Sequence, residues 1–219
     1  MAKKAASETR KVVITAPDLR KILFKIQGTA PYVQLRFSEK KKHEMMHNMT
    51  EDGQADKRKR AKKPPRNFDG EYEDAMYCTA DGKRGLPASS FRAGSISACR
   101  LVNFKMTLGK LSIFIVESGM DEKESIPLVL IEGAPEKVQH VVRNANGSAD
   151  VRTRAMWKKW SAQVLVRYDA GQFMAQDIIN LFMRVGLQVG IGEGRPDSKS
   201  SAGMGWGTFE VVKATEVKT

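Results

Sequence analysis

The end of the chain constrains its fold most, because glycine is concentrated there. Six of the eighteen glycines lie between Gly190 and Gly207, in the runs VGIGEGRP and GMGWGTF. Glycine gathers in this way where a backbone takes positive φ or approaches another molecule closely. Apolar residues at helical spacing (178–185) precede the runs, and an alternating segment (208–212) follows them. We therefore predict a helix, a glycine loop and a strand, in that order.

This order of elements excludes two familiar nucleotide-binding loops. The dinucleotide fingerprint follows a strand and opens a helix, and the lysine of a GxxxxGK[ST] loop is missing here. The loop does carry Arg195, Lys199 and Trp206. These residue types suit a phosphate backbone and a stacked base, which contributes about 1–3 kcal/mol. The alternatives are that Trp206 packs against the last helix and that Arg195 forms a surface pair with Glu193, worth under about 1 kcal/mol.

The charge balance indicates a polyanionic partner. The chain has a formal net charge of +12 and a pI near 9.7, with 41% hydrophobic and 28% charged residues. This is the footprint of a protein that binds nucleic acid or an anionic surface. Two cysteines, Cys78 and Cys99, imply no disulfide framework. No apolar run approaches a membrane span, and we expect a cytoplasmic protein.

Much of this charge lies in a segment with almost no large aliphatic residues, 38–67. We interpret it as an insertion that projects from the body and contacts phosphates, with salt-dependent affinity. The alternative is a solvated arm or a localisation signal. The basic residues assigned to nucleic-acid binding here are Lys57, Arg58, Lys59, Arg60, Lys62, Lys63 and Arg66.

Hydrophobic periodicity predicts an α+β fold. The expected strands cover 21–27, 32–37, 72–79, 111–116, 126–132, 161–168 and 208–212, and the expected helices 87–102 and 173–185. Gly186 is expected to cap the second helix in a left-handed conformation. Segment 138–151 is ambiguous. The sum predicts an antiparallel sheet with helices on one face, as in ferredoxin-like folds.

Two further groups of residues carry alternatives. Ser89 and Ser90, beside Arg92, open the first predicted helix and suit anion binding at its N-terminus. Plain N-capping by the serines is the other interpretation. Trp157 and Trp160 stand among basic residues, but we favour a core position for both because they enter a clean strand.

The sequence HEMMH at 43–47 matches a zinc-protease motif. On a helix it would place His43 and His47 on one face, with Glu44 as general base. Such a helix needs an apolar face and a third ligand, which these polar flanks and the remaining His140 do not supply. We interpret the motif as accidental and expect no catalytic residue, metal or cofactor. A metal-dependent nuclease or peptidase and a scaffold that binds an acidic protein remain the alternatives.

Three segments together resemble one family. The run GLPASSFRA at 85–93 is similar to the "IPGSS-LKG" helix opening of the RAMP superfamily, the RNA-binding proteins of CRISPR effector complexes. The closing loop, 190–207, and the early run GTAP at 28–31 fit the same family. Ala88 replaces its usual glycine, Arg92 stands where lysine is common, and the loop is longer. The whole chain also resembles small phage-encoded proteins with the same ending.

The resemblance implies a modified RNA-recognition-type sheet. Its body would comprise 1–37 and 68–219, and its insertion, 38–67, would fold over a bound strand as a thumb. We therefore expect a non-catalytic binder of single-stranded RNA or DNA in a prokaryotic cytoplasm, assembling head-to-tail along the strand. The residues expected to contact it outside the insertion are Ser89, Ser90, Arg92, Gly192, Gly194, Arg195, Lys199, Gly205 and Trp206.

Overall fold

The computed structural model describes residues 15–36, 39–47, 49–50, 65–143, 147–199 and 201–217. The basic run 57–63 lies outside these residues. The described helices are α1 (Glu39–His47), α3 (Phe68–Asp74), α4 (Ala88–Leu101), α5 (Met106–Ser112), α6 (Ala175–Arg184) and one π-helical turn, η1 (Val185–Val189). The strands are β1 (Leu19–Gly28), β2 (Tyr32–Gln34), β3 (Tyr77–Cys78), β4 (Arg84–Pro87), β5 (Ile113–Val116), β6 (Gly119–Met120), β7 (Pro127–Glu132), β8 (Glu136–Arg143), β9 (Ala149–Trp157), β10 (Ser161–Asp169) and β11 (Phe209–Val217).

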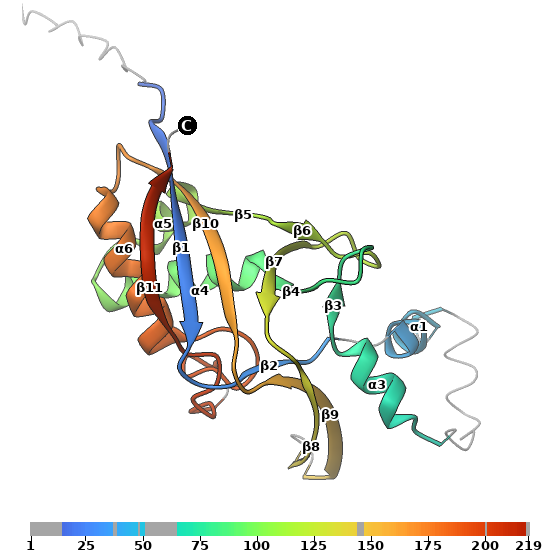
Figure 1. Cartoon of the computed structure of the whole chain (residues 1–219). Helices are drawn as coiled ribbons and strands as arrows, with labels where there is room; N and C mark the ends of the chain where they lie inside the picture. Colours follow the sequence, from blue (N-terminus) through green and yellow to red (C-terminus); the bar gives the residue numbers. More distant parts are fainter. Residues whose placement is uncertain are drawn as a thin grey trace, which may run out of the picture.

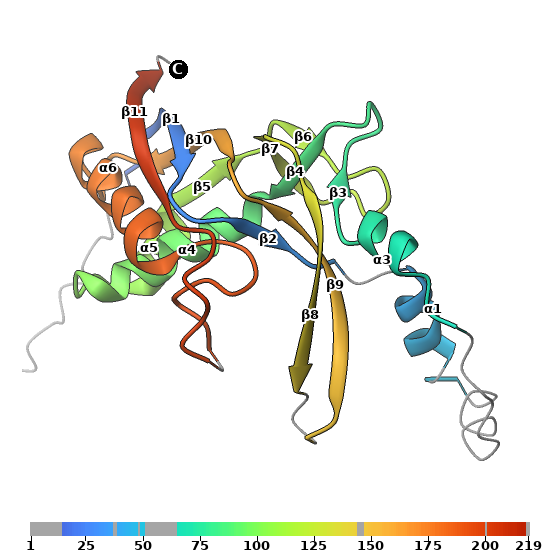
Figure 2. The same cartoon turned by 60° about the horizontal axis from the view of Figure 1, so that its bottom comes forward.

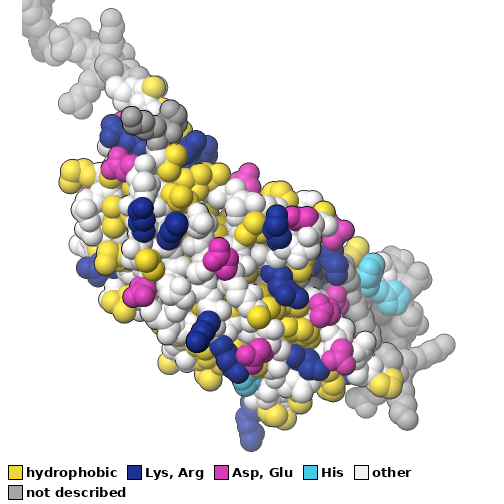
Figure 3. Space-filling view, viewed as in Figure 1, with side chains coloured by type: hydrophobic (Ala, Val, Ile, Leu, Met, Phe, Trp, Pro, Cys, Tyr) yellow, Lys and Arg dark blue, Asp and Glu magenta, His cyan; other side chains and the backbone are white. Residues whose placement is uncertain are grey.

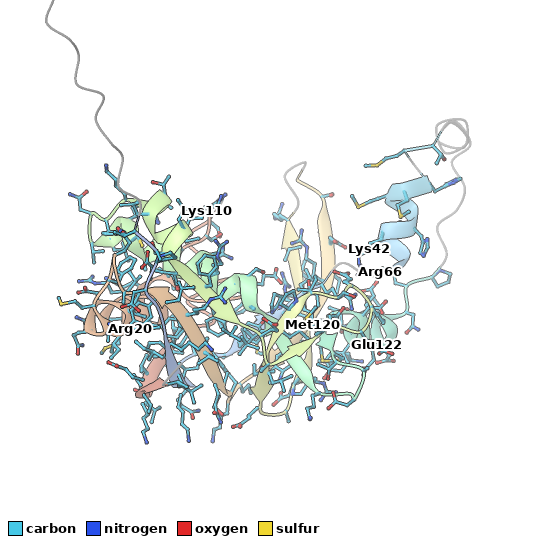
Figure 4. The ribbon with its side chains drawn as sticks, turned by 90° about the horizontal axis from the view of Figure 1, so that it is seen from above. Arg20, Lys42, Arg66, Lys110, Met120 and Glu122 are labelled. Atoms are coloured by element: carbon cyan, nitrogen blue, oxygen red, sulfur yellow. The ribbon has the colours of Figure 1, made fainter. Side chains whose placement is uncertain are left out.

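The larger of two antiparallel sheets forms the body (Figure 1). Its strands run in the order β11-β1-β10-β7-β4-β3, with β5 also paired to β10 and β6 to β7. Along the chain, β1, α4, β5, β10, α6 and β11 follow one another as two β-α-β units, apart from the shorter elements between them. Helices α4, α5 and α6 cover one face of this sheet (Figures 1 and 4). The predicted α+β class is confirmed.

The core lies between that sheet and those helices. Strand β10 alternates as predicted, with Val164 and Val166 buried and Gln163 and Arg167 exposed. From α6, Phe182 stacks on Phe24 of β1 with ring centroids 4.4 Å apart. The predicted core positions of the two tryptophans are correct, since Trp157 is 0% and Trp160 2% exposed.

A second, smaller sheet has the order β2-β9-β8. Strands β8 and β9 form a long hairpin that extends from the body next to the glycine loop (Figure 2). Within the ambiguous segment 138–151, residues 138–143 thus belong to β8 and residues 149–151 to β9. The hairpin contributes residues to the glycine loop's surroundings, as shown below.

For several predicted elements, either the boundaries or the type of secondary structure is wrong. Segment 72–79 is not one strand, because α3 occupies 72–74 and β3 only 77–78. The Asn67 side chain accepts hydrogen bonds from the Asp69 and Gly70 amides and starts this helix. Helix α5 takes the start of the strand predicted at 111–116, and β2 ends at Gln34, short of the predicted residue 37.

Gly186 is not the left-handed cap of the last helix. It lies inside η1, and the first positive φ after α6 falls at Gly190, with φ 70°. Gly186 serves close packing instead, because a Cβ there would lie 2.1 Å from the carbonyl oxygen of Phe209. As for length and polarity, none of the described helices is long and apolar enough to cross a membrane.

Candidate functional site

A hollow of roughly 860 Å³ lies between α4 and the glycine loop. Strand β2 contributes Tyr32 and Gln34 to its wall, and the first turn of α4 contributes Ser89 and Ser90. The residues that line it from the other side are Val189, Ile191, Gly192, Glu193, Arg195, Asp197 and Lys199. The hollow therefore joins two segments that are far apart in the sequence.

The glycine loop has the backbone that its composition predicts. All six glycines take positive φ, from 69° at Gly194 to 77° at Gly192. Residues with a side chain rarely adopt this region. Space is restricted as well, because a Cβ at Gly192 would lie 2.5 Å from the Tyr32 ring. The loop accordingly lies close against β2.

Backbone hydrogen bonds fix the loop in place. The Glu193 amide donates to the carbonyl of Val33 at 3.0 Å, and the Gly207 amide donates to that of Pro31 at 2.8 Å. Within the loop, Met204 donates to Gly194 at 2.7 Å. Because these bonds exist before any ligand arrives, binding would cost little ordering of the loop.

Arg195 does not pair with Glu193, so the surface-pair alternative is wrong. Its Nη1 donates to the carbonyl of Gly192 at 3.1 Å. Glu193 instead accepts two hydrogen bonds from Arg154 of β9, Nη2–Oε1 at 2.6 Å and Nε–Oε2 at 2.7 Å. The Glu193 carboxylate, two residues before Arg195, is thus neutralised by Arg154.

Asp197, the second carboxylate of the hollow, is also engaged. It accepts hydrogen bonds from the Ser97 hydroxyl and from Arg100 Nη2, the latter at 2.8 Å. The Ser97 bond, followed by the bond and charge of Arg100, lowers the pKa of Asp197 below its usual value. These contacts tie the loop to α4. They leave Lys110, Arg195 and Lys199 as the cations on the lining that make no ion pair within the described residues.

The serines at the start of α4 do not cap it, which corrects the N-capping interpretation. Helix α4 begins at Ala88 with Pro87 in the cap position and no side-chain cap bond. Ser89 and Ser90 instead follow in the first turn and line the hollow. First-turn amides have no acceptor within the helix, and the helix dipole is positive there. This end of α4 therefore favours an anion.

The structure places Arg92 apart from the hollow. Its Nη2 donates to the carbonyl of Lys110 at 2.6 Å and its Nε to that of Ile113 at 3.2 Å. Its guanidinium also lies 5.3 Å from the centroid of the Phe114 ring. Arg92 thus joins α4 to α5 and β5, and it does not line the hollow with Arg195 and Lys199.

Arg66 lies elsewhere too. Beside α3 it pairs with Glu71 at 2.6 Å and with Asp150 of β9 at 3.0 Å. The hydrogen bond to Glu71, with lesser contributions from both charges, raises the pKa of Arg66. The other predicted cations of the insertion, Lys57 to Lys63, are outside the described residues.

Trp206 is half-buried and packs within the loop. A Cβ at Gly194 would lie 2.5 Å from its ring, and the His140 ring of β8 has its centroid 5.5 Å away. Trp206, Gly194 and Gly205 are not among the lining residues of the hollow. The loop is therefore linked to the β8–β9 hairpin at two points, Trp206 to His140 and Glu193 to Arg154.

Sequence reasoning missed Arg100 and Lys110. Arg100 shares one face of α4 with Ser89, Ala93 and Ser97, a helical spacing that a search for polar faces would have found. Lys110 belongs to α5, which was not predicted as a helix, and no local pattern marks it (Figure 4).

The HEMMH motif lies on α1, where His43 and His47 are exposed. In the described part of the chain, no three His, Cys, Asp or Glu side chains come together as a metal site.

No family model matches the sequence. None of the curated proteins matches it either. Among solved structures, the fold is similar to a chain from the cryo-EM structure of the Type III-B Cmr-beta bound to cognate target RNA. The similarity covers 91% of this chain, with 11% sequence identity and a TM-score of 0.48. This chain spans 61% of the length of that one.

Proposed function

We propose that the chain binds single-stranded RNA or DNA in the hollow between α4 and the glycine loop, without catalysing a reaction on it. One observation carries the proposal: the fold brings the start of α4 and the loop's cations to the same hollow. Each of these segments was singled out for anion binding by its own sequence pattern. The hollow thus combines them into one surface.

The chemistry of the hollow supports a phosphate ligand. Arg195 and Lys199 supply positive charge, and the first turn of α4 supplies amides and the hydroxyls of Ser89 and Ser90. Both carboxylates on the lining are already paired. The backbone at Gly192, which has no side chain, allows a strand to approach closely. The net charge of +12 adds attraction that does not depend on sequence.

The proposal includes the finer assignment of the fold. The β-α-β-β-α-β order with strands paired as β11-β1-β10-β5 supports a ferredoxin-like body. The sequence resemblance supports placing this body in the RAMP superfamily. In that assignment, segment 38–67 closes over the strand, and copies assemble head-to-tail along it.

Fluorescence anisotropy with labelled single-stranded RNA, single-stranded DNA and duplex, each over a salt series, tests the proposal. We expect salt-dependent binding of a single strand in preference to the duplex. The double variant Arg195→Gln/Lys199→Gln should bind more weakly, with a salt slope reduced by about 1.4, since each lost phosphate contact removes about 0.7.

A matched control removes two charges elsewhere. Lys83 and Lys123 lie outside the hollow, paired with Asp81 and Asp74. The variant Lys83→Gln/Lys123→Gln should keep the native slope. Equal effects of the two double variants would reduce the binding to net charge and disprove the assigned site.

A further inference from the structure

The face of the larger sheet opposite to the helices is open. Strands β11, β1 and β10 turn this face toward the reader in Figures 1 and 3. On β1, the alternation that buries Ile22, Phe24 and Ile26 directs Lys21 and Lys25 to the open side. Lys and Arg side chains lie over β11 and β1 in Figure 3.

Two pairs of like charges stand directly opposite one another on this face. Lys25 of β1 is in register with Lys213 of β11, and Lys21 of β1 with Arg167 of β10. Like charges in directly opposed positions destabilise an antiparallel pair of strands. In Figure 4, long side chains ending in nitrogen project from these strands on the side away from α4 and α5.

These four residues are not held by carboxylates of the described chain, although the Arg167 guanidinium lies 5.3 Å from the centroid of the Phe114 ring and Glu210 of β11 shares the open face. None of them makes an ion pair with a carboxylate in the part of the chain that the structure describes. Basic residues elsewhere on the surface do so, such as Arg20 with Asp18 at 2.8 Å and Lys83 with Asp81 at 2.6 Å. The charges of these four residues are therefore available to a ligand.

A less polar row separates the two pairs. Leu23 of β1 is in register with Thr215 on one side and Leu165 on the other, and both leucines are half-buried. Lys21 and Lys25 are four residues apart on one strand, a separation of about 13 Å. The face thus presents cations, then apolar groups, then cations along the direction of the strands.

We infer that this open face is a second contact surface for the phosphodiester backbone of a nucleic acid. Lys21, Lys25, Lys213 and Arg167 would contact phosphates, and Leu23 with Leu165 would contact the sugars and bases between them. The ligand class rests on the proposed function, but the surface is separate from the hollow. A nucleic acid is favoured over an acidic protein because a protein interface needs large apolar anchors in pockets, whereas these leucines are half-buried on a pleated surface.

The test compares a short strand with a long one. The probes are 8-mers and 30-mers of oligouridylate and oligothymidylate, measured by anisotropy over a salt series. The sheet variant is Lys25→Gln/Lys213→Gln, the hollow variant Arg195→Gln/Lys199→Gln, and the control Lys83→Gln/Lys123→Gln. Far-UV circular dichroism establishes that each variant is folded.

We expect the sheet variant to bind the 30-mer several-fold more weakly, with a salt slope lower by about 1.4, and to bind the 8-mer like the native protein. The hollow variant should weaken binding of both lengths. If the native protein binds neither length, the proposed function fails. If the hollow variant loses binding while the sheet variant keeps native affinity and salt slope for the 30-mer, the second nucleic-acid surface is disproved. An acidic protein would then be the expected ligand of the open face.

Discussion

Glu193 of the glycine loop and Arg154 of the β8–β9 hairpin form a two-bond ion pair, with Nη2–Oε1 at 2.6 Å and Nε–Oε2 at 2.7 Å. The Arg154 side chain is only 6% exposed, while that of Glu193 is 27% exposed. Removing the carboxylate would leave a buried guanidinium without its counter-charge, which is costly in a protein interior. The pair therefore couples the position of the loop to that of the hairpin.

Glu193→Gln should lower the free energy of unfolding by about 1–3 kcal/mol. This is less than the cost of breaking a fully buried pair, because water reaches Glu193. Urea denaturation measures this change. Glu122→Gln, at an exposed position outside the hollow, is the matched control and should change stability by less than about 0.5 kcal/mol. Equal stability of the two variants would show that the pair does not hold the loop.

Substitutions at two glycines of the loop, Gly205 and Gly207, would distinguish the cost of backbone strain from the cost of a steric clash. Gly205 and Gly207 have φ of 73° and 70°, but a Cβ at Gly205 meets nothing within 4 Å, whereas one at Gly207 lies 1.8 Å from the Ile191 carbonyl oxygen. Gly205→Ala should cost about 1–2 kcal/mol from the left-handed conformation alone. Gly207→Ala should cost clearly more, because backbone must move. Thermal unfolding of both variants tests the order, and a reversed order would contradict the loop geometry.

Lys213→Glu should separate stability from binding. The new carboxylate would face Lys25 across the strands, so a repulsive pair becomes an attractive one, worth roughly 0.2–1 kcal/mol. We expect a higher melting temperature together with weaker binding of a 30-mer. Lys213→Gln, which only removes the repulsion, should lie between the native protein and Lys213→Glu in both measurements. A more stable variant with native binding would indicate that the like-charge pair serves no ligand.

Asp197 should contribute to acid sensitivity. Its pKa is lowered in the folded protein, chiefly by the Ser97 hydroxyl and then by Arg100. A depressed carboxyl pKa stabilises the fold above the pKa of the unfolded chain, about 3.9, and this contribution is lost as pH falls through the folded value. Asp197→Asn should therefore be less stable than the native protein at pH 6, and the difference should shrink below about pH 4.

Urea unfolding at a series of pH values from 6 to below about 4 measures the difference in the free energy of unfolding between Asp197→Asn and the native protein. Ser97→Ala serves as the second variant, because it removes the largest cause of the shift while keeping the carboxylate. Its pH dependence should be intermediate. A difference between Asp197→Asn and the native protein that stays constant with pH would show that the carboxylate's charge is not what ties the loop to α4.

Elements with a clean period were predictable from the sequence. Strand β10 and helix α6 each have one apolar side, and the six glycines of the loop predicted positive φ without any tertiary information. Helix α3 was missed because it is short, has no buried residue and depends on a single capping residue, Asn67. The N-capping interpretation of the α4 serines was wrong because Pro87 occupies the cap position.

The candidate site was only partly predictable. Its two main segments, at Ser89 and at Gly192–Lys199, were found because each carries a local pattern, serines after a proline in the first and glycines with basic residues in the second. The partner of Glu193 was not, because Arg154 is far away in sequence and only strand register brings it near. The opposed pair Lys25 and Lys213 depends on the register of β1 with β11, which contains a bulge after Lys25 and cannot be read from either strand alone.

The π-helical turn η1 determines where the glycine loop points. Gly190 donates its amide to the Val185 carbonyl at 2.7 Å, five residues back, so this turn holds one residue more than an α-helical turn would. Each residue of a helix rotates the chain by about 100°. Deleting one residue from η1 would make the last turn of α6 regular while the loop left it in another direction. The contact of Asp197 with α4 therefore depends on the number of residues in this one turn as well as on the residues of the loop.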